Sequence, residues 1–246
     1  MKRVYSLPPD SEADAVIFKS LLAEVEASTS DIGSVLELNG LSFSNAPCRG
    51  ACMRNGPRGQ FVDLFSSRVL PFRFDATARV LWDFYSGTGK HRGPLYYKSA
   101  KTLECSSDTV MEKFALELFA NNTRADFRIW QVLRRLAEVD GMKIVWACIV
   151  EPVELDNKSF LSCAFQEKGY IICKPSDHSS DVPQPDSSEL LRCHRVTPYI
   201  SSTAPTTLTH EQIGAIGTMI KFVLSLDSIT SQLEGITDLL CTNVEP

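Results

Sequence analysis

The sequence predicts an α+β protein in which a curved antiparallel sheet packs on a long C-terminal helix. Residues 143–150, KIVWACIV, form its most apolar and β-prone run, and Asp140-Gly141 before them suits a two-residue hairpin turn. About six strand-like segments follow one another as a meander. Residues 209–240 then carry apolar side chains at helical spacing after a capping box of Thr209 and Gln212. A helix of roughly thirty residues is about 45 Å long and can cover one face of such a sheet.

Length and composition fit a single globular domain with a small N-terminal elaboration. The chain has 246 residues, of which 43% are hydrophobic and 22% charged, so it needs no disulfide or metal to hold it together. A net charge of −5 with scattered charges argues against nucleic-acid binding. Most of the eight cysteines lie in apolar runs, and no segment resembles a signal peptide or a membrane span. We therefore expect a cytoplasmic protein with at most transient membrane contact.

Residues 1–59 are expected to form the N-terminal elaboration, a helix followed by a flexible loop. The main domain is expected at residues 60–241. Residues 1–11 have the composition of a flexible lead-in, and residues 12–27 form an amphipathic helix. Its apolar positions are Ala15, Phe18, Leu21, Leu22 and Val25. The mixed run that follows, 32–38, favours a short strand, and residues 39–59 favour a loop because they are rich in Gly, Pro, Asn, Arg and Cys.

The main domain starts with elements that have clear boundaries. Residues 60–70 have strand character, and Pro71 ends them. A helix is predicted at 75–86, where Ala78, Leu81, Trp82 and Tyr85 share one face, and glycines in 87–93 break it. Residues 95–105 are predicted to form a strand.

Two segments fit a helix as well as a strand, and we predict strands for both. Apolar residues in 109–119 and 126–139 recur at helical spacing, but the turn at Asp140-Gly141 requires a partner strand before it. A strand over 126–139 places alternate residues on opposite sheet faces. One face would then carry Trp130, Val132, Arg134 and Leu136, and the other Phe127, Ile129, Gln131 and Leu133.

The rest of the meander contains shorter predicted elements. Strands at 160–166 and 170–174 are expected to be joined by a turn at Lys168-Gly169, followed by a polar, proline-rich loop at 175–188. A final strand at 189–200 and a Thr/Pro-rich linker at 201–207 precede the C-terminal helix.

Three segments carry a family resemblance: LPFRFDATARVLWDFYSG, DTVMEKFALELFANNTRADFRIWQVLRRLAEVDGMKIVWACIVEPVE and EKGYIICKP. They resemble the START-like proteins expanded in oomycetes, which include the mating-specific proteins, most closely over residues 108–175. The resemblance implies a helix-grip fold, in which the curved sheet holds the C-terminal helix and leaves a cavity between them. It also implies binding of one hydrophobic molecule, often a sterol or phospholipid, without catalysis or a cofactor, and it supports strands over 109–139.

The candidate ligand contacts lie where strand alternation or the helical stripe would point into that cavity. They are Trp130, Arg134, Trp146, Cys148, Phe165, Ile172, His194, Ile216, Met219 and Val223. The sequence leaves open whether the apolar ones are packed core or cavity lining. Alternation points one of Arg134 and Arg135 inward, unless both lie on an exposed edge or across a bulge. An inward arginine would need an anionic ligand group or a carboxylate, for which Glu151, Glu154 and Glu167 are possible partners.

No sequence motif indicates catalysis or metal binding. Gly87-Thr88-Gly89-Lys90 lacks the first glycine of a phosphate-binding loop, and the Cys48/Cys52 pair has no second pair to complete a zinc site. Ser176-Asp177-His178 are adjacent, whereas a catalytic triad converges from distant positions. We therefore expect a non-catalytic ligand-binding protein. The alternative is a protein-interaction module with a filled cavity that binds an unknown partner through residues 39–59 or through the exposed side of a helix.

Overall fold

The computed structural model describes residues 12–41, 47–57, 59–86, 95–120, 123–155, 158–159, 164–176 and 187–199 of the chain. The elements in order are α1 (Glu12–Leu38), β1 (Cys48–Gly56), β2 (Gly59–Leu70), α2 (Phe74–Ser86), β3 (Leu95–Cys105), β4 (Thr109–Ala120), β5 (Thr123–Glu138), β6 (Gly141–Leu155), β7 (Lys158–Ser159), β8 (Ala164–Pro175) and β9 (Ser188–Tyr199). The predicted lead-in at 1–11, linker at 201–207 and C-terminal helix at 209–240 lie outside the described residues.

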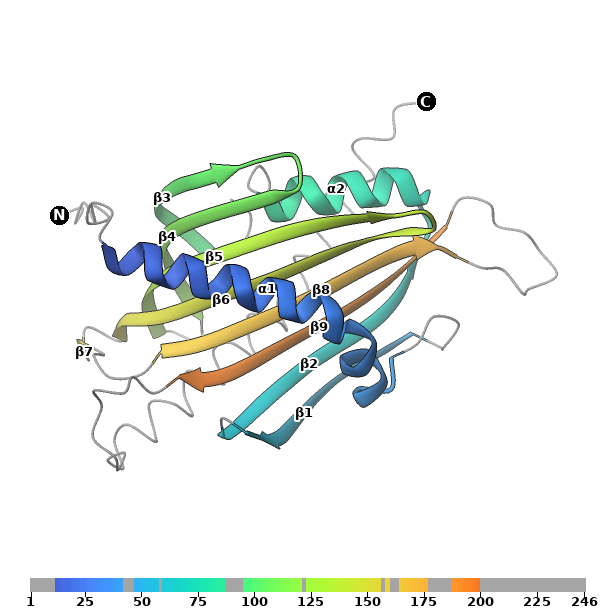
Figure 1. The fold of residues 1–246 in the computed structure, drawn as a ribbon. Helices are drawn as coiled ribbons and strands as arrows, with labels where there is room; N and C mark the ends of the chain where they lie inside the picture. Colours follow the sequence, from blue (N-terminus) through green and yellow to red (C-terminus); the bar gives the residue numbers. More distant parts are fainter. Residues whose placement is uncertain are drawn as a thin grey trace.

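The strands form one curved antiparallel sheet with a helix on each face. The strand order is β1-β2-β9-β8-β6-β5-β4-β3, and the two-residue β7 pairs with β6. Figure 1 shows α1 crossing the near face of this sheet and α2 lying behind it. Helix α1 contacts β5, β6 and β8, whereas α2 contacts β5, β6, β8 and β9. We call the two sides of the sheet the α1 face and the α2 face.

Each face of the sheet has its own hydrophobic core. Trp130, Val132 and Val145 pack against α1, while Leu133 and Trp146 belong to the core shared with α2. The strand prediction for 126–139 is confirmed, including the alternation of its side chains between faces. Its helical spacing was misleading because both faces are buried, which removes the simple apolar–polar alternation of a half-exposed strand. The strands predicted at 60–70, 95–105, 109–119 and 189–200 and the helix at 75–86 are confirmed as well.

Helix α1 continues through residues 32–38, so the prediction of a strand there is wrong. Ile32 and Val35 are buried and continue the stripe of Phe18, Leu21 and Val25 that packs on the sheet. The helix ends in a Schellman motif: Leu41 N donates to Leu36 O at 2.9 Å and Gly40 N to Glu37 O at 3.0 Å. Gly40 has a φ of 63°, which glycine adopts without a Cβ clash.

Replacing Gly33 with alanine is expected to stabilise the protein. Gly33 lies on the exposed side of α1, and a Cβ at this position meets nothing within 4 Å. Alanine loses less backbone entropy on folding, so the free energy of unfolding should rise by about 0.5–1 kcal/mol. Urea denaturation followed by circular dichroism measures the change. A lower unfolding midpoint would contradict the helical assignment of this segment.

Residues 48–56 form a strand, so the prediction of a loop over 39–59 is wrong for this part. Strand β1 pairs with β2 from Cys48↔Ser67 to Gly56↔Gly59, and it forms one edge of the sheet made by the described residues. Its residues are exposed or half-buried, so the segment lacks the apolar pattern of an internal strand. Strand β1 is therefore part of the sheet, and α1 packs on it. The expected domain boundary at residue 59 stays a prediction.

Two glycines predicted to form turns lie inside strands. The β5–β6 hairpin exists, but Glu138 pairs with Gly141, so the turn residues are Val139 and Asp140. A Cβ on Gly141 would lie 2.9 Å from the carbonyl oxygen of Cys173 on β8. Strand β8 runs unbroken through Lys168-Gly169, where a turn was predicted. A Cβ on Gly169 would overlap the six-membered ring of Trp146, so this glycine is required for close packing.

A buried ion pair fixes the start of α1 to the sheet. Asp14, which is 4% exposed, accepts hydrogen bonds from Lys113 Nζ on β4 and from Trp130 Nε1 on β5, both at 2.7 Å. Lys113 is 3% exposed, and its Nζ lies 5.0 Å from the Trp130 ring centroid. Both carboxylate oxygens of Asp14 thus have partners, which makes the pair compatible with burial.

Candidate functional site

A polar cluster lies within the apolar core of the α2 face. Trp146 on β6 and His194 on β9 each pair with Gly169 on β8, so they flank this glycine on neighbouring strands. Glu167, two residues before Gly169, lies on the same face of β8. Its Oε1 accepts a 3.3 Å hydrogen bond from Trp146 Nε1 and forms an ion-pair contact with His194 Nε2. The Glu167 and His194 side chains are only 17% and 10% exposed.

The electrostatic surroundings keep Glu167 charged. Burial alone would raise the pKa of its carboxyl group, but the charge of His194, hydrogen bonds from His194 and Trp146, and the charge of Arg192 together lower it. On the other ring nitrogen, His194 Nδ1 is buried and has no hydrogen-bond partner among the residues that the structure describes. Nδ1 is therefore open to a partner: it accepts a hydrogen bond when the imidazole is neutral with its proton on Nε2, and it donates one when both ring nitrogens are protonated.

Aromatic and sulfur side chains surround this cluster. Tyr85 of α2 stacks on Trp146 with ring centroids 5.8 Å apart, and the centroids of Trp146 and His194 are 5.4 Å apart. Cys148 pairs directly with Glu167 across the strands, and burial together with the Glu167 charge raises the pKa of its thiol well above the usual value. A thiol with this pKa is neutral and unreactive near pH 7, so Cys148 acts as a small apolar group here.

Helix α2 covers only part of this face. Its 13 residues span about 20 Å, whereas the 16 residues of β5 span about 50 Å. The ring of Trp82, a buried residue of α2, lies 4.9 Å from the Arg135 guanidinium. This guanidinium also donates to Asp108 Oδ1 at 3.0 Å and to the carbonyl oxygen of Ser107. Arg135 thus ties α2 to the segment that precedes β4.

The described members of the predicted ligand set do not share one face. Trp146, Cys148 and Phe165 belong to the α2-face core, and His194 contacts Trp146 there. The remaining described residues, Trp130, Arg134 and Ile172, lie on the α1 face. The other predicted contacts, Ile216, Met219 and Val223, lie outside the described residues.

The interpretation of Arg134 as an internal anchor does not match its surroundings. Its Nη1 lies 3.8 Å from Glu26 Oε1 on α1, and their side chains are 28% and 66% exposed. Trp130 donates a hydrogen bond to Asp14 and so helps to attach α1 to the sheet. Glu167, Tyr85 and Arg192 were not predicted as site residues. The prediction placed a turn at Lys168-Gly169 and ended the strand at residue 166. It therefore did not extend the strand alternation that puts Phe165 and Glu167 on one face.

The described residues contain no group of three His, Cys, Asp or Glu side chains placed to hold a metal ion. Among the described helices, neither combines the length and apolarity needed to cross a membrane.

Among known proteins, the chain is similar to several solved structures. No protein-family model matches the chain, and no curated protein matches its sequence. The Zhui aromatase/cyclase from Streptomyces sp. R1128 is 12% identical with a TM-score of 0.46, over 75% of this chain and 96% of that one. Human StAR-related lipid transfer protein 5 is 10% identical with a TM-score of 0.42, over 91% and 99%. TTHA0849 from Thermus thermophilus is 11% identical with a TM-score of 0.42, over 74% and 99%. Membership in the oomycete START-like family stays a prediction.

Proposed function

We propose that this protein binds a hydrophobic ligand, such as a lipid or sterol, on the α2 face of its sheet, without catalysis. One observation carries the proposal. In the part of the chain that the structure describes, a charged Glu167 and a buried His194 whose Nδ1 has no hydrogen-bond partner lie inside an otherwise apolar core. Unsatisfied buried polar atoms are rare in folded proteins because each costs about 1–3 kcal/mol. A ligand whose apolar body packs beside Trp146 and whose polar end reaches His194 would satisfy this atom.

Apolar contact would supply most of the binding free energy. Burying about 400 Å² of ligand apolar surface contributes a gross term near 10 kcal/mol, from which association and ordering costs are subtracted. A hydrogen bond to His194 adds about 0.5–1.5 kcal/mol and mainly sets the orientation of the ligand. The site would therefore accept ligands of varied apolar shape and be selective for a polar group at one end.

Tryptophan fluorescence can test the proposal, because the chain has matched tryptophans on opposite faces. We expect a panel of phospholipids and sterols to contain a ligand that changes the fluorescence saturably. Trp146→Phe should remove most of that change, whereas Trp130→Phe on the α1 face should retain it. No response to any member of the panel would contradict the proposal and favour a filled interior and a protein-interaction role. A response that depends on Trp130 would place the ligand on the other face.

Acid–base catalysis is the second candidate function, and the same pair favours it. A carboxylate that holds one imidazole nitrogen leaves the other free to accept a proton, which is the arrangement used by catalytic histidines. His194→Gln separates the two functions. If the protein only binds, this variant should retain apolar ligands with a modest loss of affinity, and mass spectrometry should recover every bound ligand unchanged. A ligand converted by the natural chain and left intact by His194→Gln would establish catalysis.

A further inference from the structure

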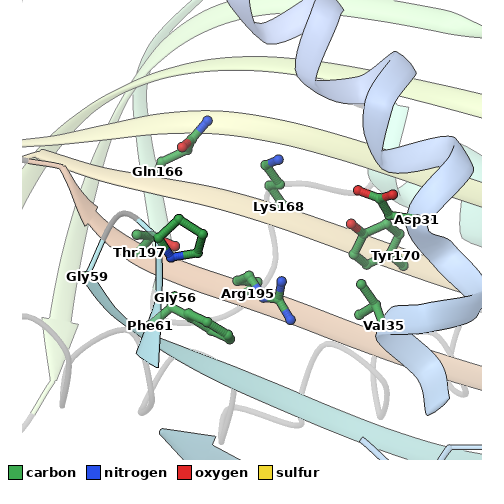
Figure 2. A pocket seen from close by; sticks show the side chains of 11 residues that line it. Asp31, Val35, Gly56, Gly59, Phe61, Gln166, Lys168, Tyr170, Arg195 and Thr197 are labelled. Carbon is green, nitrogen blue, oxygen red and sulfur yellow. The ribbon is translucent and has the colours of Figure 1, made fainter. Parts of the chain in front are cut away.

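A pocket opens on the α1 face, on the side of the sheet away from the Glu167–His194 cluster. It has a volume of about 190 Å³ and lies between α1, the β1–β2 turn and the strands β8 and β9. Figure 2 shows Lys168 and Arg195 on its floor, with Asp31 and Val35 of α1 on one side and Phe61 on the other. Pockets for drug-sized ligands measure roughly 300–1,000 Å³, so this one fits a smaller molecule.

Two cations lie directly opposite each other in this pocket. Lys168 on β8 pairs with Arg195 on β9, an arrangement that is unfavourable unless other charges compensate it. Glu24 of α1 forms an ion pair with Lys168. Asp63 of β2, which is fully buried, receives Arg195 Nε at 2.7 Å and Nη2 at 2.8 Å. These carboxylates hold both cations in place.

Both cations keep hydrogen-bond donors after these internal contacts. Lys168 has three N–H groups and Arg195 has five, and the partners found among the described residues use one and two of them. Arg195 also stacks on Phe61, with its Cζ 4.1 Å from the ring centroid, which limits its rotation. The pocket therefore offers several pre-positioned, charged donors beside an apolar wall of Val35, Pro57 and Phe61.

The charges around the pocket determine how an anion would bind. Among the described residues around the pocket, Lys168, Arg195 and Arg54 face Glu24, Asp63 and Asp31, so these three cations balance these three carboxylates. A balanced set does not attract anions over long distances, and binding has to come from short, charge-assisted hydrogen bonds. Asp31, exposed at the rim, would oppose a bound anion.

We propose that this pocket is a second ligand site, which binds a small monocarboxylate with an apolar body. The carboxylate oxygens accept hydrogen bonds from Lys168 and Arg195, whose spare donors match its two oxygens. The apolar body packs against Val35 and Phe61. This site is independent of the proposed hydrophobic ligand, since it lies on the opposite face of the sheet.

Benzoate is a suitable probe, with benzyl alcohol as its uncharged counterpart. In titrations of the full chain followed by NMR at constant ionic strength, benzoate should shift the amide signals of Gly56, Gly59 and Thr197 saturably. We expect a dissociation constant on the order of 1 mM, and at least about tenfold weaker binding of benzyl alcohol. Equal binding of the two probes, or no saturable shift, would overturn the proposal.

Variants connect the effect to the pocket. Lys168→Gln should weaken benzoate binding about tenfold or more, because one charge-assisted hydrogen bond is lost. Asp31→Asn removes the opposing charge and should strengthen binding about two- to threefold, with little risk to folding at an exposed position. Lys143→Gln is the matched control, since Lys143 also pairs with a carboxylate, Glu138, outside the pocket. An equal loss of affinity in Lys143→Gln, or weaker binding in Asp31→Asn, would refute a specific site.

Discussion

Replacing Asp14 with alanine is expected to lower the free energy of unfolding by about 3–5 kcal/mol, because it leaves the Lys113 ammonium buried without a counter-charge. Lys113 Nζ and Trp130 Nε1 both lie 2.7 Å from this carboxylate, and both side chains are nearly inaccessible to solvent. The variant loses the attachment of α1 to β4 and β5 at the start of the helix. Chemical denaturation monitored by circular dichroism measures the loss.

Further variants separate the buried charge from ordinary side-chain loss. The double variant Asp14→Asn/Lys113→Met removes both charges and keeps an oxygen acceptor for Trp130, so it should be more stable than Asp14→Ala. Glu26→Ala, which breaks the exposed contact with Arg134, should change the free energy of unfolding by no more than about 0.5 kcal/mol. If Asp14→Ala resembled Glu26→Ala, the buried pair could not be the anchor of α1.

Replacing Gly169 with alanine is expected to destabilise the protein by about 3 kcal/mol, the upper end of the usual cost of overpacking. The new Cβ would overlap the six-membered ring of Trp146, a rigid group that cannot bend away. Displacing this ring disturbs the hydrogen bond to Glu167 and the stacking on Tyr85. We therefore also expect a shift in the emission maximum of tryptophan and weaker binding of any ligand on the α2 face.

The clash can be isolated by removing the ring first. In a Trp146→Val background, Gly169→Ala should cost no more than about 1 kcal/mol, because the overlapping atoms are gone. The difference between the two backgrounds gives the coupling energy of the pair. Equal costs in both backgrounds would mean that this position needs the backbone conformation of glycine and that the packing of Gly169 against Trp146 is unimportant.

Much of the strand content could be predicted from the sequence, and the errors have identifiable causes. Apolar patterns placed β2, β3, β6 and β9 correctly. Strands β4 and β5 were placed by the expected hairpin turn and by the family resemblance, against the helical spacing of their apolar residues. The missed part of α1 did have a local signal, because Asn39-Gly40 followed by Leu41 is typical of a helix C-terminus. Strand β1 had no such signal, since an exposed edge strand forms through backbone pairing with its neighbour and not through burial of its side chains.

The candidate site could be predicted only in part. Alternation was enough to propose Trp146, Cys148, Phe165 and His194, and these lie on one face. Glu167 was proposed only as a possible partner of an inward arginine and not as a ligand contact, because Gly169 looked like a turn residue. The small size of Gly169 instead serves the packing of Trp146. The Lys168–Arg195 pair of the second pocket depends on the β8–β9 register, which no pattern in the sequence specifies.

Hydrophobic periodicity and turn residues, which act between neighbours along the chain, determined that this protein would build an antiparallel sheet with an amphipathic helix before it. The assignment of Trp130 and Trp146 to opposite sides of that sheet, and the grouping of Glu167 with His194, were decided by tertiary structure alone. Strand register sets those contacts, and register depends on the packing of segments far apart in the chain, such as Asp14 against Lys113 and Gly169 beneath Trp146.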